Sequence, residues 1–135
     1  AAGINEKIFI NTKGQISEGT VCNVFFVRKN MIYTPQLSCG LLPGILREYI
    51  MERFQVTETI IYPDELMYYE ECFVTNSLMG VMPVRQLGNI CFPHCKSNMR
   101  EANLTLKHTA SAAFAYGITC RKRSRQKNRF LRCAA

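Results

Sequence analysis

Short apolar runs separated by polar turns organise the first 92 residues of this 135-residue chain. Runs rich in Val, Ile, Phe and Tyr predict β-strands, because such side chains suit a pleated, half-buried surface. The expected strands cover residues 7–11, 15–18, 22–28, 31–34, 56–62, 71–75 and 81–87, with a hairpin turn at Lys29-Asn30 between two of them.

Helical spacing follows the turn at Pro43-Gly44, where apolar residues recur every three to four positions. The expected helix carries Ile45, Leu46, Tyr49, Ile50 and Phe54 on its apolar face, and Arg47, Glu48 and Glu52 outside that face. Residues 63–70 predict a second, short helix with proline in its first turn. Strands alternating with short helices indicate an α+β fold with a mixed sheet, although the order alone leaves the strand pairing open.

Charge divides the chain near residue 92. Residues 1–92 hold seven basic and nine acidic side chains, whereas residues 93–135 hold ten basic and one acidic. We therefore expect a body over 1–92 and a basic tail over 93–135, solvated or disordered because its like charges repel, or else an extension unrelated to the body. The block 121–132 attracts nucleic-acid phosphates in principle, but no aromatic stacking platform accompanies it, so we do not expect a nucleic-acid partner.

Composition bears on the expected location of the protein and on its membrane and metal partners. No apolar run approaches the ~20 residues of a membrane span, and no signal-like leader opens the chain, so we expect no membrane partner. Seven cysteines, an odd number with several in strand-like runs, are typical of reduced thiols and predict a cytoplasmic location. Cys91, His94, Cys95 and His108 have loose spacing and no second ligand pair follows, so we expect no metal site.

The segment ISEGTVCN places Glu18 beside a glycine, just before an apolar strand. A carboxylate can hydrogen-bond the protonated nitrogen of a pyridine-ring cofactor and raise the pKa of that nitrogen by charge attraction. Gly19 lets the backbone pass close to a flat ring, and the amide of Asn23 can fix the local loop. By itself, the segment is more typical of an ordinary strand turn.

Two later segments offer what a phosphate group requires. In GLLPGILR a helix begins, so the backbone N–H groups of Ile45 and Leu46 can donate to an anion at the positive end of the helix dipole. In TNSLMGVMPV a strand breaks into a polar turn, where Ser77 offers a hydroxyl and Leu78 an amide. Taken singly, each segment fits a simple structural turn as well.

Together and in this order, the three segments resemble those of aminotransferase class IV, the fold type IV pyridoxal-phosphate enzymes. The resemblance covers residues 1–90 and implies the larger, C-terminal domain of the D-amino-acid aminotransferase-like fold. It implies pyridoxal 5′-phosphate as the cofactor, with the glutamate on the ring nitrogen and the amides and hydroxyl on the phosphate. The cofactor-binding residues that it implies are Glu18, Asn23, Ile45, Leu46, Ser77 and Leu78.

Within the family, TNSLMGVMPV is most similar to the aminodeoxychorismate lyases, which release pyruvate and 4-aminobenzoate for folate synthesis. Branched-chain and D-amino-acid aminotransferases more often carry other turns there, and they stay open as alternatives. A noncatalytic remnant whose basic tail attracts nucleic acid is the third alternative. The resemblance also implies a small amino substrate and a homodimer in the complete enzyme.

Three departures from the family pattern affect what we expect of this chain. Cys22 stands where Ser is common, and Leu46 where Thr is common. The lysine to which the family attaches its cofactor lies farther upstream than the seventeen residues that precede Glu18, and Lys7 and Lys13 are too near to replace it. We therefore expect a domain cut at its front edge, with no catalytic lysine and little or no turnover by the chain alone.

Overall fold

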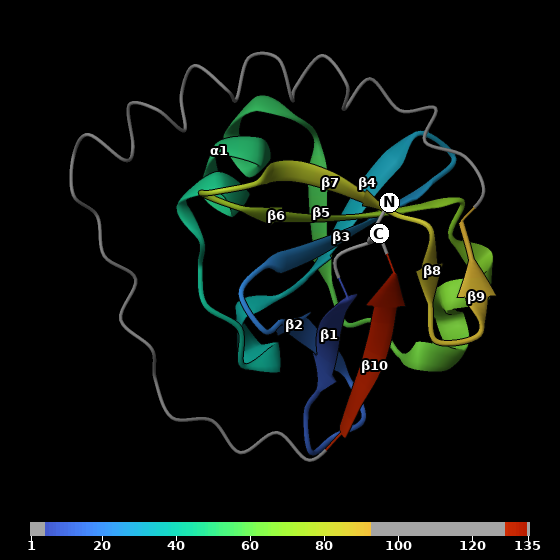
Figure 1. The fold of residues 1–135 in the computed structure, drawn as a ribbon. Helices are drawn as coiled ribbons and strands as arrows, with labels where there is room; N and C mark the ends of the chain where they lie inside the picture. The colour runs from blue at the N-terminus through green and yellow to red at the C-terminus, as the bar shows by residue number, and fades with distance from the viewer. Residues whose placement is uncertain (1–4, 93–128, 135) are drawn as a thin grey trace.

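The computed structural model describes residues 5–92 and 129–134, which form two five-stranded sheets, one α-helix and two 3₁₀-helices (Figure 1). Sheet A has the order β2-β1-β10-β8-β9, with β1 (Asn5–Ile10), β2 (Ile16–Gly19), β8 (Gln86–Leu87), β9 (Ile90–Cys91) and β10 (Arg129–Ala134). Sheet B has the order β5-β4-β3-β6-β7, with β3 (Asn23–Arg28), β4 (Met31–Pro35), β5 (Val56–Thr59), β6 (Glu71–Asn76) and β7 (Gly80–Val84). The helices are η1 (Leu37–Cys39), α1 (Ile45–Arg53) and η2 (Pro63–Tyr68).

Sheet B is a mixed sheet. Its neighbours are antiparallel except for β4 and β5, which run parallel and are joined by α1. A parallel pair needs such a crossover connection, whereas β3 and β4 need only the tight turn at Lys29 and Asn30, whose φ values are 49° and 60°. Positive φ at both positions is the backbone of a type I′ hairpin turn, so the predicted hairpin is confirmed.

Alternate residues of β3 and β6 face two different cores. On one side, the rings of Phe25 and Phe73 stack with centroids 5.0 Å apart and pack with Leu46 and Ile50 of α1. On the other side, sheet B packs with residues of sheet A in a cluster that contains Ile8, Ile16, Val24, Phe26, Cys72, Val74, Val84 and Leu87. Sheet B is therefore the middle layer between sheet A and α1.

The predicted α+β class with a mixed sheet is confirmed, and most of the expected elements are present. The single strand expected over 81–87 is wrong: it divides at Arg85 into β7 and β8, which lie in different sheets. The strand expected to reach residue 62 ends at Thr59, and the second expected helix is a 3₁₀-helix. Among the described helices, none is long and apolar enough to cross a membrane.

Arg47 corrects the predicted faces of α1. We expected it outside the apolar face, but its side chain is only 3% exposed and forms an ion pair with Glu58, with Nη2 and Oε1 2.5 Å apart. Nη2 also donates to the carbonyl oxygen of Pro35 at 3.2 Å. Ile45, expected on the buried face, is 38% exposed. Periodicity failed here because β4 and β5 supply partners that stabilise a buried cation.

The last described segment corrects the predicted tail. Residues 129–134, which we expected to be solvated or disordered, form β10 between β1 and β8 (Figure 1). β10 pairs with β1 along all six of its residues and with β8 on its other side. Backbone pairing with these two strands thus orders a segment whose basic composition suggested disorder. Residues 93–128, which include His94, Cys95 and His108, lie outside the described part of the chain. The two-part division stays a prediction there.

Candidate functional site

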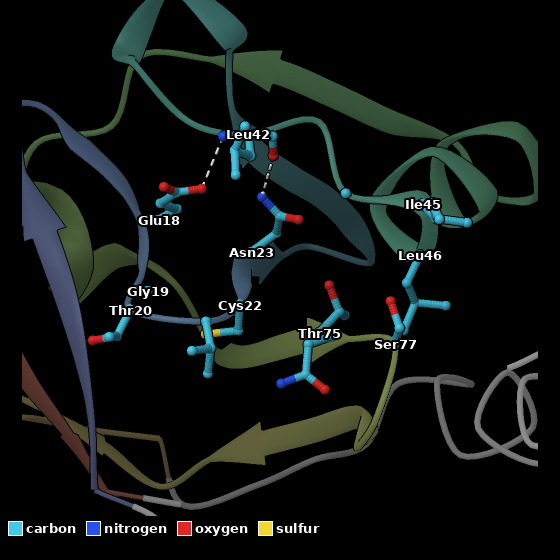
Figure 2. A pocket seen from close by; sticks show the side chains of 13 residues that line it. Glu18, Gly19, Thr20, Cys22, Asn23, Leu42, Ile45, Leu46, Thr75 and Ser77 are labelled. Atoms are coloured by element: carbon cyan, nitrogen blue, oxygen red, sulfur yellow. Dashed lines mark hydrogen bonds between the residues drawn. The ribbon is translucent and has the colours of Figure 1, made fainter. Parts of the chain in front are cut away.

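A pocket of about 220 Å³ opens where β2, the turn before β3, the start of α1 and the end of β6 meet (Figure 2). Three separate segments line it: Glu18, Gly19, Thr20, Val21, Cys22 and Asn23, then Leu42, Gly44, Ile45 and Leu46, then Thr75, Asn76 and Ser77. The three motifs recognised in the sequence thus contribute to one cavity, although they are far apart along the chain.

The turn between β2 and β3 is held by Glu6, a buried residue of β1. Its Oε1 accepts hydrogen bonds from the backbone N–H groups of Thr20 and Val21, the latter at 3.2 Å. A Cβ on Gly19 would lie 2.2 Å from Sγ of Cys22 and 2.9 Å from Oε1 of Glu6, so no larger residue fits without rearrangement. The glycine therefore makes room for the turn itself.

Glu18 and Asn23 fix the loop that leads into α1. Oε2 of Glu18 accepts a hydrogen bond from the N–H of Leu42 at 2.8 Å, and Nδ2 of Asn23 donates to the carbonyl oxygen of Leu42 at 2.9 Å (Figure 2). The amide of Asn23 was expected to fix its own loop, but the bond that it makes holds the loop of Leu42, 19 residues further along the chain. A carboxylate has about four acceptor sites, so the bond to Leu42 is compatible with a further donor from the pocket.

The start of α1 presents backbone amides at the pocket. Gly44 is the N-cap residue, and the first intrahelical bond runs from the N–H of Glu48 to the carbonyl oxygen of Gly44 at 3.0 Å. The amides of Ile45 and Leu46 precede that bond, and no side chain caps them. A Cβ on Gly44 would lie 2.3 Å from Oδ1 of Asn23. Gly44 thus leaves space, which the amide of Asn23 occupies.

Two hydroxyl groups come from the end of β6 and the turn after it. Thr75 is 2% exposed, and its Oγ1 has no hydrogen-bond partner among the residues that the structure describes. Ser77 lies beside it, and both face the pocket near Leu46 (Figure 2). An unpaired buried hydroxyl is costly, so a ligand oxygen at this place would satisfy a group that the fold leaves without a partner.

Leu78 does not take the place predicted for it. Its N–H donates to Oδ1 of Asn76 at 3.0 Å, and the N–H of Met79 donates to the same oxygen at 2.7 Å. The Leu78 side chain is 82% exposed, and the residue is not part of the pocket lining. The amide expected to bind phosphate is therefore engaged within the turn, because an asparagine side chain readily bonds the backbone two residues ahead.

Five of the residues predicted from the sequence line the pocket: Glu18, Asn23, Ile45, Leu46 and Ser77. Two residues that shape or line the site were not predicted, Thr75 and Glu6. Thr75 ends the strand expected over 71–75 and received no binding role, although strand alternation from Phe73 puts it on the same face as the predicted helix. Glu6 had no signal at all, since nothing in the sequence links it to a turn that follows more than ten residues later.

Comparison with known proteins gives the family. The family model for amino-transferase class IV matches residues 1–87, nearly two thirds of the chain. The chain therefore belongs to aminotransferase class IV, a family of enzymes that use pyridoxal 5′-phosphate.

Relatives within this family carry more than one activity. A probable branched-chain-amino-acid aminotransferase of Thermotoga maritima is 36% identical over 90 residues, which are 63% of this chain and 33% of that protein. The aminodeoxychorismate lyase of Bacillus subtilis is 32% identical over 90 residues, which are 63% of this chain and 31% of that protein. The chain thus spans about a third of the length of the curated relatives it matches.

Solved structures agree on the fold. A putative 4-amino-4-deoxychorismate lyase from Legionella pneumophila superposes with a TM-score of 0.67 at 29% identity, over 76% of this chain and 40% of that one. The branched-chain aminotransferase from Thermobaculum terrenum, solved in its pyridoxal-phosphate form, superposes with a TM-score of 0.68 at 23% identity, over 81% of this chain and 38% of that one. At that identity, the second likeness concerns the fold alone.

Proposed function

We propose that this chain is the cofactor-binding part of a pyridoxal-phosphate-dependent enzyme. The observation that carries the proposal is that one pocket holds the Glu18 carboxylate on one side and the start of α1, with Ser77, on the other (Figure 2). A carboxylate suits a protonated pyridine nitrogen, and helix amides suit a phosphate, so the two ends of the pocket match the two ends of the cofactor. The hydroxyl of Thr75, which has no partner within residues 5–92 and 129–134, fits an anionic group as well.

Each residue has a distinct role in the proposal. Glu18 holds a proton at the ring nitrogen, while its bond to Leu42 keeps its carboxylate oriented. The amides of Ile45 and Leu46 and the hydroxyl of Ser77 bind the phosphate, aided by the positive end of the helix dipole. Bound in this way, pyridoxal phosphate supplies an electron sink for the carbanion that forms at the α-carbon of the amino substrate.

For the complete enzyme we propose 4-amino-4-deoxychorismate lyase activity, in which pyruvate is released and 4-aminobenzoate remains. The wording of TNSLMGVMPV supports it, as do the Bacillus and Legionella relatives. Transamination of branched-chain amino acids is the second candidate, favoured by the slightly higher identity of the Thermotoga relative, 36% against 32%. Homodimer formation and a cytoplasmic location stay predictions that accompany the proposal.

The two activities differ in what they consume. The natural protein that carries this sequence is expected to release pyruvate from aminodeoxychorismate without any added oxo acid. Amino transfer from leucine or valine to 2-oxoglutarate, with no pyruvate from aminodeoxychorismate, would instead establish the second candidate. For the 135-residue chain alone, the expectation of little or no turnover stays a prediction, which pyruvate release by the purified chain would contradict.

Cofactor binding by the chain itself can be tested without turnover. Pyridoxamine 5′-phosphate is a suitable probe because its binding requires no bond to a lysine. Glu18→Gln keeps an oxygen for the N–H of Leu42 but removes the charge, so we expect it to weaken probe binding about tenfold or more. The measurement is a fluorescence or calorimetric titration.

Glu52→Gln is the matched control, because Glu52 is exposed on α1 and does not line the pocket. It removes the same charge from the protein and should leave the affinity unchanged. Equal affinities for the wild type, Glu18→Gln and Glu52→Gln would remove Glu18 from the site.

A further inference from the structure

We propose that the hydroxyl of Thr75 is a ligand-binding group that donates to the phosphate seated at the start of α1. The inference rests on the proposed function and gives a binding role to a residue of the segment TNSLMGVMPV for which the resemblance implied none. Its starting observation is a polar atom that the fold buries and leaves unbonded: Thr75 is 2% exposed, and its Oγ1 has no partner among the described residues.

The strand register places Thr75 near the helix start. Thr75 pairs directly with Asn23 across β3 and β6, and Oδ1 of Asn23 lies against the N-cap residue Gly44. Directly opposed residues on antiparallel strands point to the same face of a sheet, so Thr75 and Asn23 share the face that α1 covers. Asn23 therefore lies next to both Thr75 and the N-cap residue of α1, Gly44.

The pocket distinguishes Thr75 from the other buried hydroxyl of this kind. Ser17 is 1% exposed and its Oγ also has no partner within the described part of the chain, but Ser17 is not part of the pocket lining. Of these two hydroxyls, only that of Thr75 belongs to a residue that lines the pocket. A hydroxyl rotates freely and can direct its proton at a phosphate oxygen, which joins it to the amides of Ile45 and Leu46 and to Ser77 as a donor.

The test compares three variants with two probes. Thr75→Val keeps the shape and β-branching of the side chain and removes the hydroxyl, Thr75→Ser keeps the hydroxyl, and Ser17→Ala removes a buried unpaired hydroxyl elsewhere. We expect Thr75→Val to weaken binding of pyridoxamine 5′-phosphate about tenfold, and Thr75→Ser and Ser17→Ala to stay within about threefold of the wild type. Binding of phosphate-free pyridoxamine should be the same in Thr75→Val and the wild type.

Thermal unfolding of the unliganded proteins supplies the second measurement. Removing a hydroxyl that has no partner should leave the Tm of Thr75→Val equal to that of the wild type or higher. A lower Tm, or a failure to fold, would show that the fold itself uses the hydroxyl and would overturn the inference.

The remaining outcomes separate this inference from the proposed function. If the wild type binds pyridoxamine 5′-phosphate and Thr75→Val binds it equally well, the inference is wrong and the proposed function stands. If Thr75→Val weakens both probes alike, the hydroxyl acts on the ring and not on the phosphate, which also overturns the inference. If the wild type binds no phosphate probe, the proposed cofactor site is wrong, and the role of Thr75 with it.

Discussion

At the scale of single residues, the site depends on which backbone and side-chain groups are already engaged. Leu42 is held from both sides by Glu18 and Asn23, and the space beside Gly44 is filled by the amide of Asn23. The sequence could indicate Glu18 and Asn23 because their chemistry is visible in the motif. It could not indicate that Asn76 takes the amide of Leu78, since that competition depends on the geometry of the turn.

Gly44→Ala tests the contact between the helix start and Asn23. The added methyl group would overlap Oδ1 of Asn23, which is fixed by its bond to Leu42, so we expect a destabilisation of about 1–3 kcal/mol and weaker binding of pyridoxamine 5′-phosphate. Urea unfolding and ligand titration measure the two effects.

A double-mutant cycle identifies the cause. In an Asn23→Ala background the overlap is gone, so Gly44→Ala should cost less there than in the wild type. Strictly additive costs would show that Gly44 is constrained by something other than Asn23.

At the scale of elements, α1 is both the crossover of sheet B and one wall of the pocket. Its first turn is tied to sheet B by Arg47, which reaches Pro35 in β4 and Glu58 in β5. Strand and helix positions were largely predictable, because they follow from local patterns of apolar residues. The burial of Arg47 was not, because a helix shows its own periodicity but not the partners that neighbouring strands bring to it.

Removing the Arg47 side chain should loosen the start of α1. Arg47→Met keeps most of the volume but leaves the Pro35 carbonyl and Glu58 without their donor, so we expect a loss of about 2–4 kcal/mol in urea unfolding. Glu58→Gln should cost less, since the Glu58 side chain is 40% exposed and water can replace part of the interaction.

Arg85→Met serves as the comparison, because Arg85 is exposed in the turn between β7 and β8. We expect its effect to stay within about 0.5 kcal/mol. An equally small effect of Arg47→Met would show that the buried ion pair contributes nothing to the stability of α1.

At the scale of the whole molecule, sheet A is completed by the described segment farthest along the chain. β10 enters sheet A between β1 and β8, with Ile8 opposite Leu131 and Leu87 opposite Cys133. The layered α+β body was predictable from residues 1–92, but the insertion of β10 was not, because pairing at a distance of more than a hundred residues leaves no local pattern. The prediction of a solvated tail followed the many basic residues and gave no weight to the two apolar residues of RFLR.

Deleting residues 129–135 should therefore destabilise the body. Without β10, the edges of β1 and β8 lose their partner, and unpaired edges promote association between chains. We expect the truncated chain to lose a large part of a typical ~5–15 kcal/mol stability and to aggregate in size-exclusion chromatography. Leu131→Val keeps the strand and should behave like the wild type. A truncated chain with an unchanged urea midpoint would contradict the pairing seen here.

The position of β10 in sheet A also orders events during synthesis. More than a hundred residues separate β1 from β10, so the edge of β1 stays unpaired with β10 while the intervening residues are translated. Sheet B has no such delay, since all five of its strands precede residue 85. The nascent chain thus exposes one strand edge from the synthesis of β1 until that of β10, and a chaperone matters most in that interval.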